Sequence, residues 1–179
     1  SNIRFKGAYR VAYFIPNVTS MVAMTIVFGS VFSDSFGLVN SALTALWAEP
    51  VAWLSTDWGI KITIAVMVIW RFTGYNAIIY LAGLQSIPTE LYDAARVDGA
   101  SSWRIFTSIT IPLLRPVILF TVITSTIGGL SLFTEPQVLL GNSGGTDEAG
   151  MTIVLYQYNQ AFTQFDFGYG SAIAWALFI

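Results

Sequence analysis

Long uncharged apolar runs constrain this chain more than any other feature. Residues 11–32 form a run of 22 residues without a charged side chain, and a helix of that length reaches roughly 33 Å, enough to cross a bilayer. Residues 62–84 and 116–133 form two further runs, whose only charged residue is Arg71. Charged residues make up 10% of the chain, against about 25% in a soluble domain. We therefore expect an all-α integral membrane protein.

The apolar runs predict one transmembrane domain over the whole chain. No cleavable signal peptide is apparent, because the first run is too long and lacks a small-residue cleavage site. The chain begins on a short basic segment and ends inside an apolar run, so we expect a fragment of a longer protein. The predicted spans are 11–32, 62–84, 116–133 and, incomplete, 167–179.

The first span carries an interruption near its start, at Pro16 and Asn17. Proline removes a backbone donor from a helix, and in a membrane the freed groups are satisfied by neighbouring helices. The pair therefore predicts a kink, and either a packed structural kink or a functional hinge is compatible with it.

The residue types that are missing exclude several classes of function. The chain has no cysteine and no histidine, which removes disulfides, thiol nucleophiles and the commonest zinc and haem ligands. No pair of carboxylates converges in one membrane layer, so little is left for acid–base or nucleophilic catalysis. No basic face suggests nucleic-acid binding. We expect neither an enzyme nor a metal site.

The connections on one side of the spans are acidic and rich in tryptophan. Residues 33–59 carry Trp47, Trp53 and Trp58, a residue type that favours the membrane boundary, and residues 41–48 can form a short interfacial helix. Residues 134–150 are predicted to be a turn-rich loop. Residues 151–165 place apolar side chains on one helical face but are too short to span, which predicts a re-entrant or interfacial helix within the external loop 134–166.

Charge distribution predicts which way the chain crosses the membrane. Basic residues concentrate at the N-terminus and in residues 85–115, and Lys61 is the one base in the opposite connections. By the positive-inside rule residues 85–115 are cytoplasmic and the acidic loops external, in a multi-pass protein of the cell membrane. The supporting bases are Arg4, Lys6, Arg10, Arg96, Arg104 and Arg115; the external acids are Asp34, Glu49, Asp57, Glu135, Asp147, Glu148 and Asp166.

Arg71 lies inside the second predicted span. A charged side chain at membrane depth is costly unless it is paired or faces water, which makes it a candidate functional residue. The alternative is a structural role, in which the guanidinium satisfies backbone carbonyls between helices. Both interpretations of Arg71 are compatible with the sequence.

Residues 88–116, called the polar island below, interrupt the apolar runs with a charged segment. Pro88 ends the preceding helix and Thr89 can cap a new one, while Gly99 can end that helix in a left-handed conformation. Ser101 or Ser102 can cap a second short helix before Pro112 and Pro116 redirect the chain into the next span. The island is thus predicted to be a helix–turn–helix, either an ordinary interfacial loop or an element that a soluble partner grips.

The spacing within the polar island resembles the EAA loop of ABC-importer permeases, E-A-A-x3-G-x9-I-x-L-P. Asp93-Ala94-Ala95, Gly99 and Ile109-Thr110-Ile111-Pro112 fit it, with Asp93 in place of Glu and Ile111 in place of Leu. Asp93 keeps the charge on a side chain one methylene shorter. Further segments resemble the carbohydrate branch of these permeases (maltose-permease F-like, multiple-sugar and glycerol-3-phosphate types): F-I-P-N at 14–17, G-L-V-N at 37–40, W-L-S at 53–55, L-A-G-L-Q-S-I-P-T-E-L-Y at 81–92 and F-D-F-G-Y-G-S-A-I-A at 165–174.

The resemblance implies a truncated type I ABC-importer permease (MetI-like) helical bundle that imports sugars. Family members usually have at least one more span before Arg4 and a complete last span after Ile179. The polar island is then the coupling helix, which docks on a cytoplasmic ATPase subunit. The implied coupling residues are Glu90, Asp93, Ala94, Ala95, Arg96, Asp98, Gly99, Ile109 and Pro112.

The resemblance also implies partners. We expect a cytoplasmic ABC ATPase, a second permease subunit, an extracytoplasmic solute-binding protein, a sugar and membrane lipid. The chain has no G-x4-G-K-[ST] phosphate loop, so we expect no cofactor in it, with ATP and Mg bound by the ATPase. Alternatives are a permease for another solute, such as a glycerol phosphate, an amino acid or a peptide, and a passive channel or membrane scaffold.

Sugars are held by aromatic faces and by amide or hydroxyl groups in mostly apolar cavities. Each side chain of this kind at membrane depth can instead pack or hydrogen-bond within the helix bundle. The candidates for a substrate path are Arg71, Tyr75, Asn76, Tyr156, Asn159 and Gln160.

Overall fold

In the computed structural model, residues 18–179 are described, and they are helical without any strand. They divide into two compact units. Unit 1 contains residues 72–126 and unit 2 contains residues 18–71 and 127–179. The all-α prediction is confirmed for the described part of the chain. Arg4, Lys6, Arg10, Pro16 and Asn17 lie outside it.

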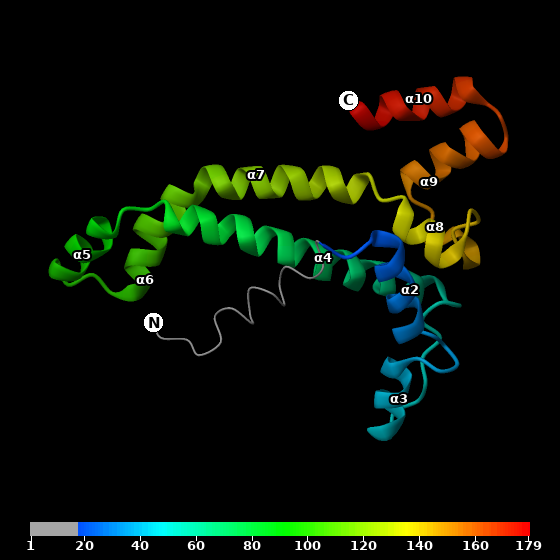
Figure 1. The fold of residues 1–179 in the computed structure, drawn as a ribbon, viewed down its shortest axis with the longest axis horizontal. Helices are drawn as coiled ribbons and strands as arrows, with labels where there is room; N and C mark the ends of the chain where they lie inside the picture. The colour runs from blue at the N-terminus through cyan, green and yellow to red at the C-terminus, as the bar shows by residue number, and fades with distance from the viewer. Residues whose placement is uncertain (1–17) are drawn as a thin grey trace. The chain divides into compact units, whose positions relative to one another are not determined.

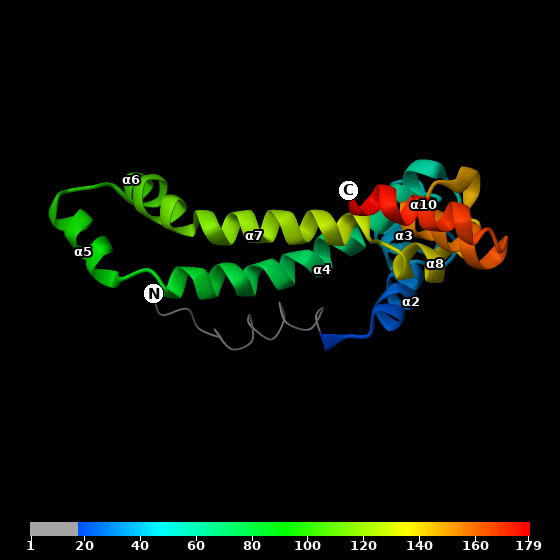
Figure 2. The ribbon, with the colours of Figure 1, turned by 90° about the horizontal axis from the view of Figure 1, so that it is seen from above.

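Unit 1 is built on two antiparallel helices that lie side by side in Figures 1 and 2: the second half of α4 (Asp57–Gln85) and most of α7 (Ile111–Leu130). Gly83 lets them approach closely, because a Cβ there would meet Val117 Cγ2 at 2.9 Å and Leu114 Cδ2 at 3.0 Å. The sequence analysis did not single out this glycine.

Polar side chains add two hydrogen bonds between these helices. The Tyr80 hydroxyl lies 2.7 Å from Thr121 Oγ1, and Asn76 Nδ2 donates to Ser125 Oγ at 3.1 Å. Thr121 also donates back to carbonyls of its own helix, which lets a hydroxyl lie in an apolar environment without an unpaired donor.

The entrance to α7 differs from the prediction. The helix begins at Ile111 rather than 116, with Pro116 inside it, and it follows α6 (Ser102–Ile105) through a π-helical turn at Phe106–Thr110. The missing N–H of Pro112 cannot complete an α-helical ladder, and a π turn just before it widens the backbone. Figure 1 shows α6 turned away from the axis of α7. The bend therefore lies at the π turn, and the two prolines do not break the helix.

Two helical stretches, Asp57–Gln85 and Ser102–Leu140, are long and apolar enough to cross a membrane. Only 17% and 6% of their most apolar windows are buried within the protein. Helices of a soluble core would bury most of that surface, so these expose it to lipid or to other helices. Asp57–Gln85, with 29 residues, is about 43 Å long and includes the predicted span 62–84.

In unit 2, α2 (Met21–Val31) packs on α8 (Thr134–Leu140), and a Cβ at Gly29 would meet Leu139 Cδ1 at 3.0 Å. The prediction of a loop over 134–150 was wrong at its start. Pro136 is tolerated in the first turn of α8 because its N–H would have no partner there, and Gly141 ends the helix at φ 73°. The rest of the segment is turns and one 3₁₀ turn, Thr146–Glu148.

Only residues 18–32 of the predicted first span are described. Within them the helix α2 has 11 residues and starts after an extended Ser20, so by itself it is too short to cross a bilayer.

The C-terminal part of unit 2 contains α9 (Ile153–Tyr158), a π turn at Asn159–Thr163 and α10 (Phe167–Phe178). Thr152 and Asp166 cap the two α-helices by accepting from Leu155 N and Tyr169 N.

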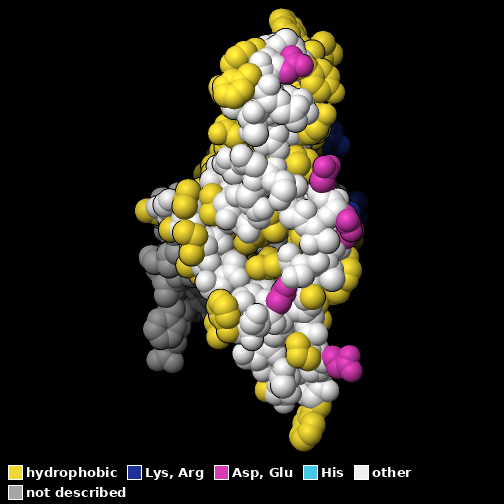
Figure 3. Space-filling model, turned by 90° about the vertical axis from the view of Figure 1, so that its right-hand side faces the viewer, with side chains coloured by type: hydrophobic (Ala, Val, Ile, Leu, Met, Phe, Trp, Pro, Cys, Tyr) yellow, Lys and Arg dark blue, Asp and Glu magenta, His cyan; other side chains and the backbone are white. Residues whose placement is uncertain are grey.

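Figure 3 shows scattered acidic side chains over one face of the molecule, among apolar and neutral ones.

Asn40 organises the connection between α2 and α4. It lies in α3 (Leu38–Ala45), and its amide donates to the carbonyls of Asp34 and Val51 at 3.1 and 2.8 Å. Its Oδ1 accepts from Val51 N at 2.9 Å and from Trp53 Nε1 at 3.0 Å. All four hydrogen-bonding positions of a buried amide are therefore used. The segments 37–40 and 53–55, which carry part of the family resemblance, meet at this residue.

We predict that Asn40→Ala destabilises this connection. The variant leaves the Val51 and Trp53 donors unpaired, which costs about 1–3 kcal/mol per buried group. The midpoint of thermal unfolding of the detergent-purified protein should fall and protease cleavage within residues 34–55 should accelerate. Ser35→Ala is the matched control because Ser35 is exposed. Equal stability of the two variants would contradict the role of Asn40.

Candidate functional site

The first helix of the polar island is α5 (Thr89–Val97), which starts one residue earlier than predicted. Pro88 occupies the N-cap position, at φ −57° and ψ 130°, and Thr89 is the first helical residue with no capping hydrogen bond. A proline before the helix already holds an extended backbone, so the threonine is not needed as a cap. Glu90 lies in the first turn and Arg96 in the last, as the helix dipole favours.

Gly99 ends α5 in the left-handed conformation that the sequence predicts, at φ 71°. Ala100 N donates to Ala95 O at 2.9 Å, and Gly99 N donates to Arg96 O at 3.1 Å. These two bonds form a Schellman motif, which satisfies carbonyls at the end of the helix. A Cβ at Gly99 would meet nothing within 4 Å, so backbone conformation and not space within this chain requires glycine there.

Ser101 caps α6, as predicted, by accepting from Arg104 N at 3.3 Å. Between α5 and α6 lies a hollow of about 510 Å³. Its lining brings together Ala95, Asp98, Gly99 and Ile109 of the predicted coupling residues. The other lining residues are Ala100, Ser101, Arg104, Ile105 and Ser108.

The remaining predicted coupling residues lie outside the hollow. Asp93 forms an ion pair with Arg96 at 2.9 Å, with both side chains about two-thirds exposed. Exposed pairs of this kind contribute little to stability, so both groups are available to a partner. Glu90 and Ala94 are exposed on α5, and Pro112 is half-buried at the start of α7.

Tyr92 links the two halves of the polar island, which the sequence analysis missed. Its hydroxyl lies 3.3 Å from Thr110 Oγ1, a buried group in the π turn that leads into α7. This contact connects α5 to the entrance of a long apolar helix.

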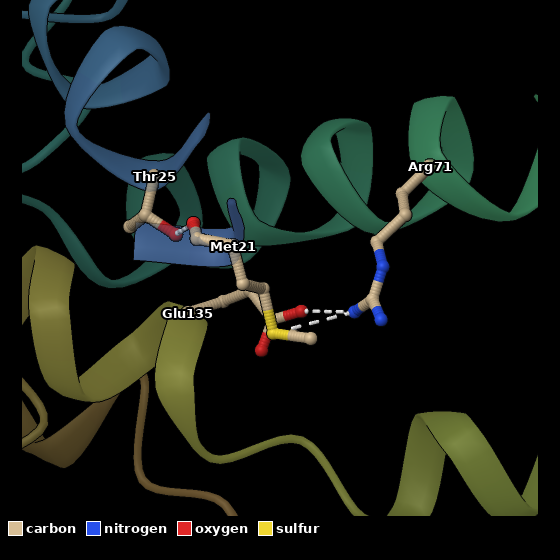
Figure 4. A network of polar contacts seen from close by, with 4 residues as sticks. All are labelled: Met21, Thr25, Arg71 and Glu135. Atoms are coloured by element: carbon tan, nitrogen blue, oxygen red, sulfur yellow. Dashed lines mark hydrogen bonds and ion pairs between the residues drawn. The ribbon is translucent and has the colours of Figure 1, made fainter. Parts of the chain in front are cut away.

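Arg71 pairs with a carboxylate. Its Nη1 lies 2.8 Å from Glu135 Oε1 and 3.5 Å from Met21 Sδ, as Figure 4 shows. The side chain of Glu135 is 2% exposed and that of Arg71 is 30% exposed. Arg71 thus forms an ion pair that joins α4 to α8. Glu135, which the charge distribution assigns to the external side, is buried, and a desolvated carboxylate requires a partner of this kind.

Tyr75 and Asn76 lie in unit 1. Tyr75 is 41% exposed. Asn76 Oδ1 is buried without a hydrogen-bond partner among residues 18–179, while its Nδ2 bonds Ser125. Tyr75 is therefore accessible to a ligand, and the free acceptor of Asn76 is not accessible in this conformation.

Tyr156, Asn159 and Gln160 lie in unit 2, on α9 and its π turn. The interaction with the Tyr169 hydroxyl is the main cause that raises the pKa of Tyr156 above its ordinary value. Gln160 lies beside Tyr156 and acts on this pKa in the opposite direction. Asn159 Nδ2 donates to Asn142 O at 2.6 Å, and its Oδ1 is buried and unpaired within the described residues. Asn159 thus anchors the 141–150 loop.

A family model described as "binding-protein-dependent transport system inner membrane component" matches residues 1–179. The chain belongs to this family. Its members named below are transport-system permeases, and membership makes this a membrane protein of the permease type, as the two long apolar helices indicate.

Two curated relatives illustrate the similarity. The lactose transport system permease protein LacF of Rhizobium radiobacter is 43% identical over 98% of this chain and 59% of that protein. The arabinooligosaccharides transport system permease protein AraP of Bacillus subtilis (strain 168) is 36% identical over 99% of this chain and 56% of that protein. The chain thus spans less than three-fifths of the length of these family members.

A solved structure has the same fold. A crystal structure of a bacterial ABC transporter involved in the import of the acidic polysaccharide alginate matches with a TM-score of 0.83 and 26% identity, over 97% of this chain and 61% of that one. A second structure contains that transporter in complex with an alginate-pentasaccharide-bound periplasmic protein. The prediction of a type I ABC-importer permease bundle is confirmed.

The sequence analysis also missed the pairing of Arg71 with Glu135. One signal pointed to it: a buried arginine needs a carboxylate, and Glu135 is the first acid after the apolar run 116–133. The two residues are 64 positions apart in the sequence, so the sequence did not show that they lie close together.

We predict that replacing only one residue of this pair destabilises the protein, because the other charge is left unpaired. Glu135→Leu or Arg71→Leu should each cost about 3–5 kcal/mol by leaving an uncompensated charge, whereas the double variant Arg71→Leu/Glu135→Leu should recover most of it. Thermal unfolding of the purified protein measures this. The exposed Lys61–Asp57 pair is the matched control, and Asp57→Leu should cost less than about 1 kcal/mol.

Uptake measurements on the same variants separate the two interpretations of Arg71. If the double variant regains stability and uptake, the arginine is structural. Regained stability without uptake would assign it to the substrate path, and a double variant as unstable as the singles would contradict the ion pair.

Proposed function

We propose that this chain is part of the membrane-spanning permease subunit of a binding-protein-dependent ABC importer for sugars. The observation that carries the proposal is the exposed helix–turn–helix of the polar island, with Gly99 left-handed and Tyr92 linking α5 to α7. Such an element is suited to receive a displacement from a soluble partner and to pass it to a membrane helix.

The partner at the polar island is a cytoplasmic ABC ATPase, which binds ATP and Mg. The chain itself carries no phosphate loop, and its contribution is the docking surface. Ala95 and Gly99 provide small contact positions beside the hollow between α5 and α6, while Asp93 and Arg96 provide charges that can exchange their mutual pair for a partner's groups. A second permease subunit and a solute-binding protein complete the importer.

The polar island lies in the cytoplasm in this proposal. Its arginines outnumber those of the opposite connections, and Glu135 no longer counts among the external acids because it pairs with Arg71. The remaining acids Asp34, Glu49, Asp57, Asp147, Glu148 and Asp166 still favour the external side for their loops.

Sugars are the substrate class that the relatives' names favour, since those proteins transport lactose and arabinooligosaccharides and the structural neighbour imports alginate. In this chain Tyr75 and Tyr156 are the accessible aromatic candidates, with Gln160 beside Tyr156. Calorimetric titration of the cognate binding protein with sugars, glycerol phosphate, amino acids and peptides discriminates sugar import from import of the other solutes.

The docking proposal predicts different outcomes for two substitutions at Gly99. Gly99→Val forces a β-branched residue into the left-handed region, at a cost of about 1–2 kcal/mol, and should abolish co-purification of the ATPase and sugar uptake. Gly99→Asn is the matched control, because asparagine adopts this conformation more readily, and should retain most of both.

Ala95→Arg tests the same surface without changing the turn. It should also abolish ATPase co-purification, with the amount of protein inserted in the membrane unchanged. Normal ATPase binding by both Gly99→Val and Ala95→Arg would contradict docking at the polar island.

A further inference from the structure

Two of the described basic residues differ from the others in having no carboxylate partner. Among the five bases in residues 18–179, Lys61, Arg71 and Arg96 pair with Asp57, Glu135 and Asp93. Arg104 and Arg115 are exposed and have no carboxylate within 4.0 Å in that part of the chain. Both flank the entrance to α7.

An exposed aromatic pair brackets Arg104 in sequence. Trp103 is 73% exposed and Phe106 is 46% exposed, and their rings lie 5.9 Å apart. Neither residue lines the hollow between α5 and α6. The lining residues from α6 and the π turn are Arg104, Ile105, Ser108 and Ile109. The segment therefore presents the aromatic pair separately from the surface proposed to meet the ATPase.

The chain direction keeps this pair close to the membrane. Phe106 begins the π turn that leads directly into α7, an apolar helix long enough to span. Trp103 precedes that turn on α6, which bends away from the axis of α7 (Figure 1). Tryptophan favours the boundary between headgroups and acyl chains, and arginine side chains near helix ends reach toward phosphate groups.

We infer that residues 102–115 form a membrane-surface anchor that binds anionic lipid. Trp103 and Phe106 lie at the headgroup–acyl boundary, and Arg104 and Arg115 contact lipid phosphates. The two unpaired cations supply the charge complementarity to an anionic leaflet. The anchor fixes the depth of the π turn, so that a displacement of α5 bends the chain at Phe106–Thr110 instead of withdrawing α7 from the membrane.

A single fluorophore tests this inference, because the chain contains no cysteine. Trp103→Cys is introduced into the full-length subunit without other cysteines, prepared both with and without the ATPase, labelled with an environment-sensitive dye and reconstituted with brominated phosphatidylcholine or brominated phosphatidylglycerol. Val97→Cys is the matched control, since Val97 is 88% exposed at the end of α5. The dye should be quenched at position 103 and not at position 97.

The arginines determine the lipid preference. Quenching at position 103 should give a relative binding constant for phosphatidylglycerol over phosphatidylcholine of roughly 5 or more, the factor that one basic residue contributes near an anionic surface. Arg104→Gln/Arg115→Gln should reduce it to about 1, whereas Lys61→Gln should leave it unchanged, because Lys61 lies outside residues 102–115 and is paired with Asp57.

Three results would overturn the inference: no quenching at position 103, equal quenching by both lipids, or quenching that disappears when the ATPase binds, which would assign the aromatic pair to the ATPase interface. Arg104 also lines the hollow between α5 and α6, so the lipid preference is measured without the ATPase, and either proposal can then fail while the other stands.

Discussion

The hydrocarbon core of a bilayer offers no hydrogen bonds to a polypeptide, and this constraint accounts for most of the structure. The two long apolar stretches are helices, which satisfy their backbone groups internally. Threonine hydroxyls within α7 bond to carbonyls one turn earlier. The one charge within residues 62–84 of α4, Arg71, is paired with Glu135 at 2.8 Å. Because an isolated charge there would be costly, this pair determines where α8 can lie against α4.

The polar island, unlike the apolar helices, exposes its charged side chains. Its charged side chains are exposed, its ion pair is a weak surface pair, and its organisation comes from local backbone features: a proline before α5, the Schellman turn at Gly99 and the Ser101 cap. A surface held by local bonds can present its side chains to a partner without losing the fold. We propose that the ATPase uses one part of this surface and that anionic lipid uses another.

Local signals explain which features could be predicted from sequence. The turn at Gly99 and the cap at Ser101 depend on neighbouring residues only, and both predictions were confirmed. The Arg71–Glu135 pair joins residues 64 positions apart, and although an arginine in an apolar run requires a carboxylate, no local pattern identifies Glu135 as that carboxylate. Helix α8 was not predicted because its polar residues and Pro136 resemble a turn-rich loop. The π turn before Pro112 was not predicted because no residue pattern indicates it.

The proposal depends most on the polar island and the acidic loops lying on opposite sides of the membrane. Ser102→Cys and Ser143→Cys each introduce the only thiol of the chain, and both serines are exposed. A membrane-impermeant maleimide added outside intact cells should label Ser143→Cys and should label Ser102→Cys only after the cells are opened. Labelling of Ser102→Cys in intact cells would contradict a cytoplasmic polar island and, with it, docking of the ATPase there.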